Sequence, residues 1–181
     1  GYEHFMMKEI HEQPKAVKDT LNSVLKDGKL DLSAVELTND EIKKISQIYI
    51  VACGSAYHAG VVAQYVIEDL AKIPVRVELA SEFRYRKPLL DPDGLVVVIS
   101  QSGETADSLA ALRLAKDKGL KTLGIVNVVG SSIAREADNV FYTLAGPEIA
   151  VATTKAYSTQ LIAAYCLALQ FAYVRGEMEL S

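Results

Sequence analysis

The sequence predicts an α/β fold: a three-layer αβα sandwich in which helices cover both faces of a parallel sheet of about five strands. One reason is a set of short runs, such as Leu95 to Ile99, that are apolar at every position, as strands buried on both faces are. The other is that these runs alternate with longer stretches of helical periodicity. A chain of 181 residues is expected to form a single domain over 1–181, with an N-terminal helical extension over about 1–46.

The extension is predicted from apolar residues at helical spacing over 2–25. Pro14 is expected to interrupt this helix. Asp27-Gly28 is expected to end it, because glycine adopts the left-handed cap conformation at low cost. A short helix should follow, with Asn39 as its N-cap.

The strands and helices of the sandwich come next. Strands are predicted over 48–52, 75–79, 95–99, 122–126 and 139–143, and helices over 57–70, 105–118, 133–136 and about 154–174. In a flavodoxin-like sheet the strand order reverses between the first and third strands, and ligands bind there at the carboxyl ends of the strands. The loops after Ala52 and Ile99 are therefore where a site is expected.

The loop after the third strand reads Ser100-Gln101-Ser102-Gly103-Glu104-Thr105 and opens a predicted helix. The first turn of a helix has unpaired N–H groups and a positive dipole end, so short hydroxyl side chains and a glycine there suit a phosphate. Simple helix capping by serine or threonine is the alternative for any one of these residues. Glu104 would repel a phosphate, so it is expected to point away and to be structural.

The loop after the first strand reads Cys53-Gly54-Ser55-Ala56-Tyr57. Gly54 permits a tight turn, and Ser55 can donate to a ligand or cap the helix. Cys53 is interpreted as a small buried hydrophobic residue, since no basic partner is evident. Cys166 is assigned to the core, and Lys155 is expected to be solvated.

Composition excludes several function classes. With 50% hydrophobic and 23% charged residues the chain is not predicted to be disordered. A net charge of -4 without a basic block argues against nucleic-acid binding, and the longest apolar run, 161–169, is too short to span a membrane. Two distant cysteines form neither a disulfide framework nor a metal site and fit a reducing, cytoplasmic compartment. Neither a Gly-x-Gly-x-x-Gly turn nor a P-loop is present, and no cofactor or metal is expected.

Several segments, in order along nearly the whole chain, carry a family resemblance. They are Ala52-Cys53-Gly54-Ser55, the run from Ala80 to Lys87 (ASEFRYRK), the run from Ser100 to Asp107 (SQSGETAD), Gly130-Ser131-Ser132, and the run from Glu148 to Ala156 (EIAVATTKA). With them the chain resembles the first sugar isomerase (SIS) module of the glucosamine-6-phosphate synthase family. The SQSGET loop alone is typical of the wider SIS superfamily, and the ASEFRYRK stretch favours the synthases.

The resemblance implies a site for a hexose 6-phosphate. It assigns the phosphate to Ser100, Gln101, Ser102 and Thr105, contacts with phosphate and sugar to Gly54, Ser55, Ala56 and Tyr57, and sugar contacts to Val151 and Thr153. Family members often have Thr-Ser where this chain has Ser55-Ala56, so one hydroxyl of the family pattern is missing here.

The resemblance also implies a reaction: fructose 6-phosphate and glutamine give glucosamine 6-phosphate and glutamate. Its catalytic residues belong to a glutaminase domain and a second SIS module that this chain lacks, so the chain is expected to bind sugar phosphate without turnover. The resemblance implies as partners those modules and a second copy of the chain in a homodimer. A stand-alone SIS sensor of sugar phosphates is the alternative, and a nucleotide-binding enzyme is a distant third.

Overall fold

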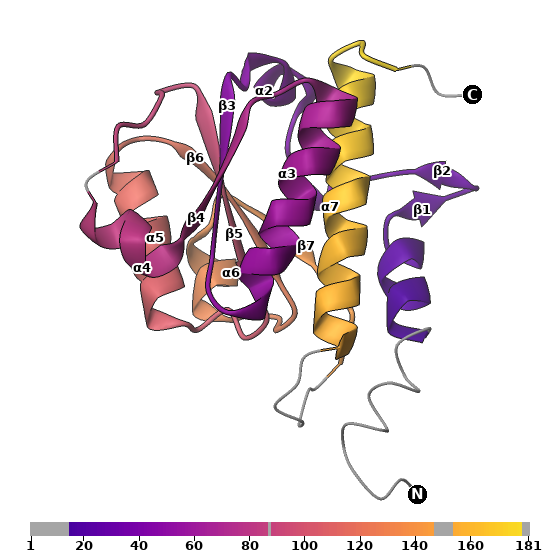
Figure 1. The fold of residues 1–181 in the computed structure, drawn as a ribbon. Helices are drawn as coiled ribbons and strands as arrows, with labels where there is room; N and C mark the ends of the chain where they lie inside the picture. The colour runs from indigo at the N-terminus through magenta and orange to yellow at the C-terminus, as the bar shows by residue number, and fades with distance from the viewer. Residues whose placement is uncertain (1–14, 87, 147–153, 179–181) are drawn as a thin grey trace, which may run out of the picture.

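A computed structural model describes residues 15–86, 88–146 and 154–178, and Figure 1 shows a central parallel sheet between two layers of helices. The strands of the sheet are β3 (Gln47–Ala52), β4 (Val75–Leu79), β5 (Gly94–Ser100), β6 (Lys121–Val126) and β7 (Asn139–Tyr142). They lie in the order β4-β3-β5-β6-β7 and are all parallel. This confirms the predicted α/β sandwich and its flavodoxin-like order, with each predicted strand displaced by at most one residue at either end.

Each face of the sheet has its own hydrophobic core, because alternate residues of a strand point to opposite faces. Ile48 and Ile50 of β3 pack with α3 (Ser55–Ala71) and α7 (Thr154–Val174). Tyr49 and Val51 pack on the other face with α4 (Ala80–Tyr85), α5 (Ala106–Asp117) and α6 (Ser132–Glu136). All seven residues of β5 are buried, as expected of the central strand of a sheet covered on both sides.

The N-terminal segment differs from the helix predicted over 2–25. Within the described residues it is helical over 15–22, and 25–30 form a hairpin of β1 (Leu25–Lys26) and β2 (Lys29–Leu30). Asp27 and Gly28 both have positive φ, of 53° and 75°, the pair of conformations that a two-residue hairpin turn needs. The dipeptide thus turns one strand into another rather than capping a helix, and Pro14 lies outside the described residues.

A 3-10 turn, η1 (Ser33–Val35), leads to the short helix α2 (Asn39–Lys44), whose N-cap is Thr38 and not Asn39. Thr38 Oγ1 accepts a hydrogen bond from Glu41 N at 3.1 Å, and Glu41 Oε1 accepts one from Thr38 N at 3.0 Å. This reciprocal capping box is closed by the glutamate three residues after the cap, which Asn39 lacks. At its other end, carbonyls of Ile42 and Ile45 accept hydrogen bonds from Arg175, at the end of α7.

Two further features bear on the sequence predictions. Helix α4 was not predicted; it is only six residues long and docks through Ala80 and Phe83, which are fully buried. Gly119 has a φ of 79° just after α5, a conformation typical of a glycine at a helix C-terminus. In the part of the chain that the structure describes, no helix is both long and apolar enough to cross a membrane.

Candidate functional site

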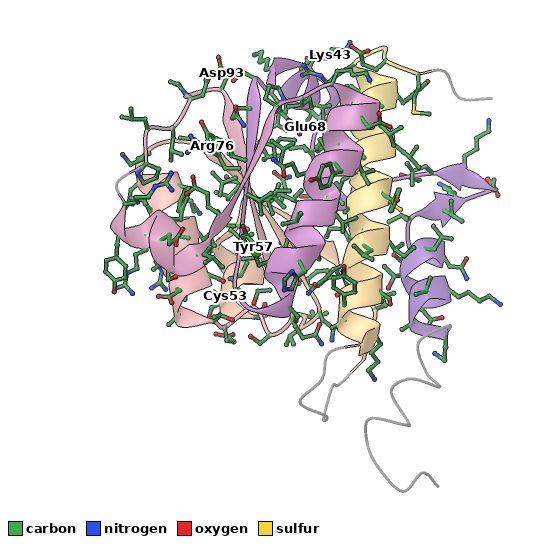
Figure 2. All side chains as sticks on the ribbon, in the orientation of Figure 1. Lys43, Cys53, Tyr57, Glu68, Arg76 and Asp93 are labelled. Atoms are coloured by element: carbon green, nitrogen blue, oxygen red, sulfur yellow. The ribbon has the colours of Figure 1, made fainter. Side chains whose placement is uncertain are left out.

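The two predicted loops begin side by side at the carboxyl ends of β3 and β5. Ala52 of β3 pairs in register with Ile99 of β5, and β3 and β5 are the neighbouring strands at which the order reverses. Figure 2 shows Cys53 and Tyr57 at this carboxyl edge of the sheet, with Asp93 at the opposite, amino edge. Topology therefore brings the two sequence-predicted loops together.

Two long helices start at this edge without a side-chain cap. Gly54 is the N-cap of α3, with a φ of 57°, and has no side chain to offer. Thr105 is the N-cap of α5, but its hydroxyl makes no capping hydrogen bond. The simple capping interpretation therefore fails for Thr105, and the first-turn N–H groups of α5 are not met by that side chain. Such N–H groups at the positive end of a helix dipole favour an anion.

Hydroxyl groups order the loop between β5 and α5, hereafter the SQSGET loop (Ser100 to Thr105). Ser100 is buried, and its Oγ accepts a hydrogen bond from Gly103 N at 3.0 Å while lying 3.4 Å from Thr105 Oγ1. Ser102 Oγ accepts one from Glu104 N at 3.1 Å. Because Ser102 Oγ accepts its bond, its O–H group can still donate to a ligand; the bond between Ser100 and Thr105 uses one of their two O–H groups and leaves the other.

Gly103 is required by its contact with the next loop. Its φ is 70°, and a Cβ there would lie 2.1 Å from Ser131 Oγ, far inside van der Waals contact. Gly103 O accepts a hydrogen bond from Ile133 N at 2.9 Å, so the SQSGET loop packs directly on the start of α6.

The side chain of Glu104 reaches the start of α6. Its carboxylate accepts hydrogen bonds from Ser132 Oγ at 2.6 Å and Ser132 N at 2.8 Å. These bonds, the one from the Ser132 side chain first, hold the pKa of Glu104 below its usual value. The residue is structural: it joins two loops of the carboxyl edge.

Buried side-chain oxygens without a hydrogen-bond partner gather at the same edge. Among the described residues they include Gln101 Oε1, Ser131 Oγ and Thr143 Oγ1, which follow β5, β6 and β7 respectively. Leaving such an atom unpaired costs about 1–3 kcal/mol. An edge that keeps several of them together is suited to a polar ligand.

The remaining sequence predictions have mixed outcomes. Val151 and Thr153 lie outside the described residues. Lys155, in the first turn of α7, is 2% exposed, so its predicted solvation is wrong. Cys53 is half-buried, with its Sγ 3.7 Å from Ser108 Oγ, rather than fully buried. Cys166 is in the core as predicted, and burial raises the pKa of its thiol to about 11.

Sequence reasoning missed two polar residues at this edge, Thr20 and Asn127. Thr20 Oγ1 accepts a hydrogen bond from Leu144 N, and Asn127 bonds to the backbone of Ala145 and Gly146. Neither stands in a motif, and their partners are 124 and 18 or 19 residues away, so no local pattern marks them.

A model of the SIS domain family matches residues 41–170. Two curated relatives bear the name glutamine–fructose-6-phosphate aminotransferase [isomerizing]. The one from Clostridium tetani is 62% identical over 98% of this chain and 29% of its own length, and the one from Caldanaerobacter subterraneus is 61% identical over the same shares. This chain therefore spans less than a third of the relatives it matches.

A solved structure extends the likeness to three dimensions. The C-terminal domain of glucosamine-fructose-6-phosphate aminotransferase from Francisella tularensis superposes with a TM-score of 0.95 and 46% identity, over 99% of this chain and 50% of that one. Because the family model matches most of the sequence, the chain belongs to the SIS domain family.

Proposed function

We propose that the chain binds a hexose 6-phosphate at the carboxyl edge of its sheet, as the sugar-phosphate-binding part of an isomerizing aminotransferase. The observation that carries the proposal is the pair of long helices, α3 and α5, that begin beside each other without side-chain caps. The names of the relatives, both aminotransferases of fructose 6-phosphate, supply the substrate class.

In this proposal the phosphate is held by N–H and hydroxyl groups rather than by a basic patch. Its ligands are Ser100, Gln101, Ser102 and Thr105, with Gly54, Ser55, Ala56 and Tyr57 approaching both phosphate and sugar, and with Val151 and Thr153 on the sugar. Charge-assisted hydrogen bonds of this kind contribute about 1.5–3 kcal/mol each. A net charge of -4 over the whole chain is compatible with such a site, since local dipoles decide it.

The whole reaction would convert fructose 6-phosphate and glutamine into glucosamine 6-phosphate and glutamate. Its sugar half needs a proton moved between adjacent carbons, which calls for a positioned acid–base side chain. We assign that step, and ammonia release from glutamine, to a second SIS module and a glutaminase domain of the larger protein. The present chain anchors the phosphate, and that binding energy holds the reacting carbons in place. A homodimer and a cytoplasmic location, in keeping with two free cysteines, complete the proposal.

Titration calorimetry tests the phosphate site. Fructose 6-phosphate should bind the wild-type chain, and Ser100→Ala should weaken binding roughly 10- to 100-fold. The matched control is Ser33→Ala in η1, at the amino edge, which should bind as the wild type does. Absence of binding to the wild type, or equal binding by Ser100→Ala, would contradict the proposal; turnover by the isolated chain would contradict the assignment of catalysis to other modules.

A further inference from the structure

We propose that Asn127 is a positioning residue: it fixes the segment after β7, on the sugar side of the site, relative to the SQSGET loop. This inference rests on the proposed function above. Asn127 follows β6 directly, and its backbone N donates a hydrogen bond to Gln101 O of the SQSGET loop at 3.2 Å. Its side chain reaches in another direction, toward the backbone after β7. Asn127 thus contacts both the SQSGET loop and the segment after β7.

Both ends of the Asn127 amide are used. Nδ2 donates to Gly146 O at 2.8 Å, and Oδ1 accepts from Ala145 N at 2.9 Å. A carboxamide presents a donor and an acceptor in one plane, so it fixes both the position and the orientation of the peptide it meets. An aspartate of the same shape would keep the acceptor and place a second oxygen against Gly146 O.

The segment that Asn127 holds is anchored at each of its first residues. Thr143 N donates to Val126 O at 2.9 Å, and Leu144 N donates to Thr20 Oγ1 at 2.9 Å. With Ala145 N bonded to Asn127, three successive N–H groups have fixed acceptors. The backbone N of Asn127 is also bonded to the SQSGET loop, so Asn127 fixes the position of the segment relative to that loop.

This segment forms part of the wall of a surface hollow of about 730 Å³. Residues that line the hollow include Lys15, Asp19, Asn127, Leu144 and Gly146, and none of its described lining residues comes from the SQSGET loop. On the helix side of Gly146 stands the buried Lys155, whose Nζ is 4.0 Å from where a Cβ at Gly146 would be. Asn127, which lines the hollow, is bonded through its backbone N to Gln101 O, so this residue links the hollow to the SQSGET loop; in the proposal the hollow receives the sugar of a phosphate-anchored ligand.

Asn127→Asp separates positioning from phosphate anchoring. Calorimetry with fructose 6-phosphate should show a roughly tenfold or greater loss of affinity, whereas inorganic phosphate should bind within about twofold of wild type. The ratio of variant to wild-type affinity for fructose 6-phosphate should return toward one as pH falls to about 4, because a protonated aspartate can again donate to Gly146 O. A merely destabilised fold would not recover on acidification.

The matched control makes the same chemical change at the amino edge. Asn139 Nδ2 donates to Val35 O at 2.9 Å, so Asn139→Asp should lower the melting temperature without changing affinity for fructose 6-phosphate. Amide exchange at Ala145 gives a ligand-free readout: it should be faster in Asn127→Asp and unchanged in Asn139→Asp. If Asn127→Asp does not fold, Asn127→Ser is measured in its place and must show the same selective loss.

The outcomes distinguish the two proposals. No binding of fructose 6-phosphate to the wild type overturns the proposed function and this inference with it. If the wild type binds, then equal affinity in the variant, an equal loss for inorganic phosphate, or unchanged exchange at Ala145 overturns the positioning role alone. Selective loss with recovery at low pH supports it.

Discussion

The two edges of the sheet use polar side chains in opposite ways. At the amino edge they close reciprocal hydrogen bonds: Thr122 N and Oγ1 both donate to Asp138 Oδ2, at 2.9 and 3.0 Å, while Asp138 N donates to Thr122 Oγ1 at 2.9 Å. The capping box of α2 and the ion pair between Lys121 and Glu41 belong to the same end. At the carboxyl edge, two long helices lack side-chain caps.

Buried oxygens without hydrogen-bond partners follow the same division. Five are found among the described residues, and four of them, on Glu78, Gln101, Ser131 and Thr143, lie at or near the carboxyl ends of strands. The exception, Asn139 Oδ1, belongs to a side chain whose amide nitrogen is bonded to Val35 O; Glu78 likewise has its other oxygen, Oε1, paired with Arg76 and Arg86. Among the described residues, more of the buried side-chain oxygens without protein partners therefore stand at the carboxyl edge than at the amino edge.

The largest effect is expected for Gly103→Ala. The positive φ and the clash with Ser131 together should lower the free energy of unfolding by about 2–5 kcal/mol and remove binding of fructose 6-phosphate. Gly119→Ala is the control at the amino edge, where φ is also positive but no atom lies within 4 Å of the added carbon. It should lose only about 1–2 kcal/mol and keep full affinity. Urea denaturation with calorimetry measures both, and similar losses in the two variants would contradict the close contact.

Thr122→Val should reduce stability without affecting binding. The fully buried hydroxyl both donates to and accepts from Asp138, so its removal should cost about 2 kcal/mol. Affinity for fructose 6-phosphate should stay at the wild-type value when measured well below the melting temperature. A loss of affinity as large as that in Ser100→Ala would erase the distinction between the edges.

Thr20→Val should reduce both stability and binding, because Thr20 comes from the N-terminal helical segment but anchors the carboxyl edge. Leu144 N would lose its acceptor, at a cost of about 1 kcal/mol, and affinity for fructose 6-phosphate should fall in parallel. Thr20→Ser keeps the hydroxyl and should restore affinity in calorimetry. A Val variant with normal affinity would show that Leu144 needs no anchor.

The smallest expected effect is on how the free energy of unfolding declines at acidic pH. The pKa of Glu104 is lowered in the folded chain by its bonds from Ser132, so its contribution to stability is complete above the unfolded-state pKa and is lost as pH falls through the folded value. Glu104→Gln should therefore flatten slightly the decline in unfolding free energy between pH 7 and pH 3. Glu41, whose pKa is lowered first by Lys121, should give the same sign at the amino edge when changed to Gln. An unchanged acid limb in Glu104→Gln would contradict the bond to Ser132.

What the sequence predicts well is set by local pattern. Apolar runs predicted the strands, and the meeting of the SQSGET loop with the loop after β3 followed from the expected strand order. Asp27-Gly28 was misassigned because the same dipeptide suits a helix cap and a hairpin turn. The buried state of Lys155 and the bonds of Asn127 and Thr20 depend on segments brought together only by the fold, so no spacing in the sequence could reveal them.

Arg175 joins the end of α7 to the end of α2, and this long-range contact bears on when the chain can fold during synthesis. Its Nη1 lies 2.8–3.3 Å from the carbonyl oxygens of Ile42, Lys43 and Ile45, which stand 130 or more residues earlier and end α2. A nascent chain that has not yet reached this arginine leaves those carbonyls without it, and α7 is still missing from one face of the sheet. Folding on the ribosome should therefore be late and cooperative, with contacts of long sequence separation forming only once the final helix has emerged.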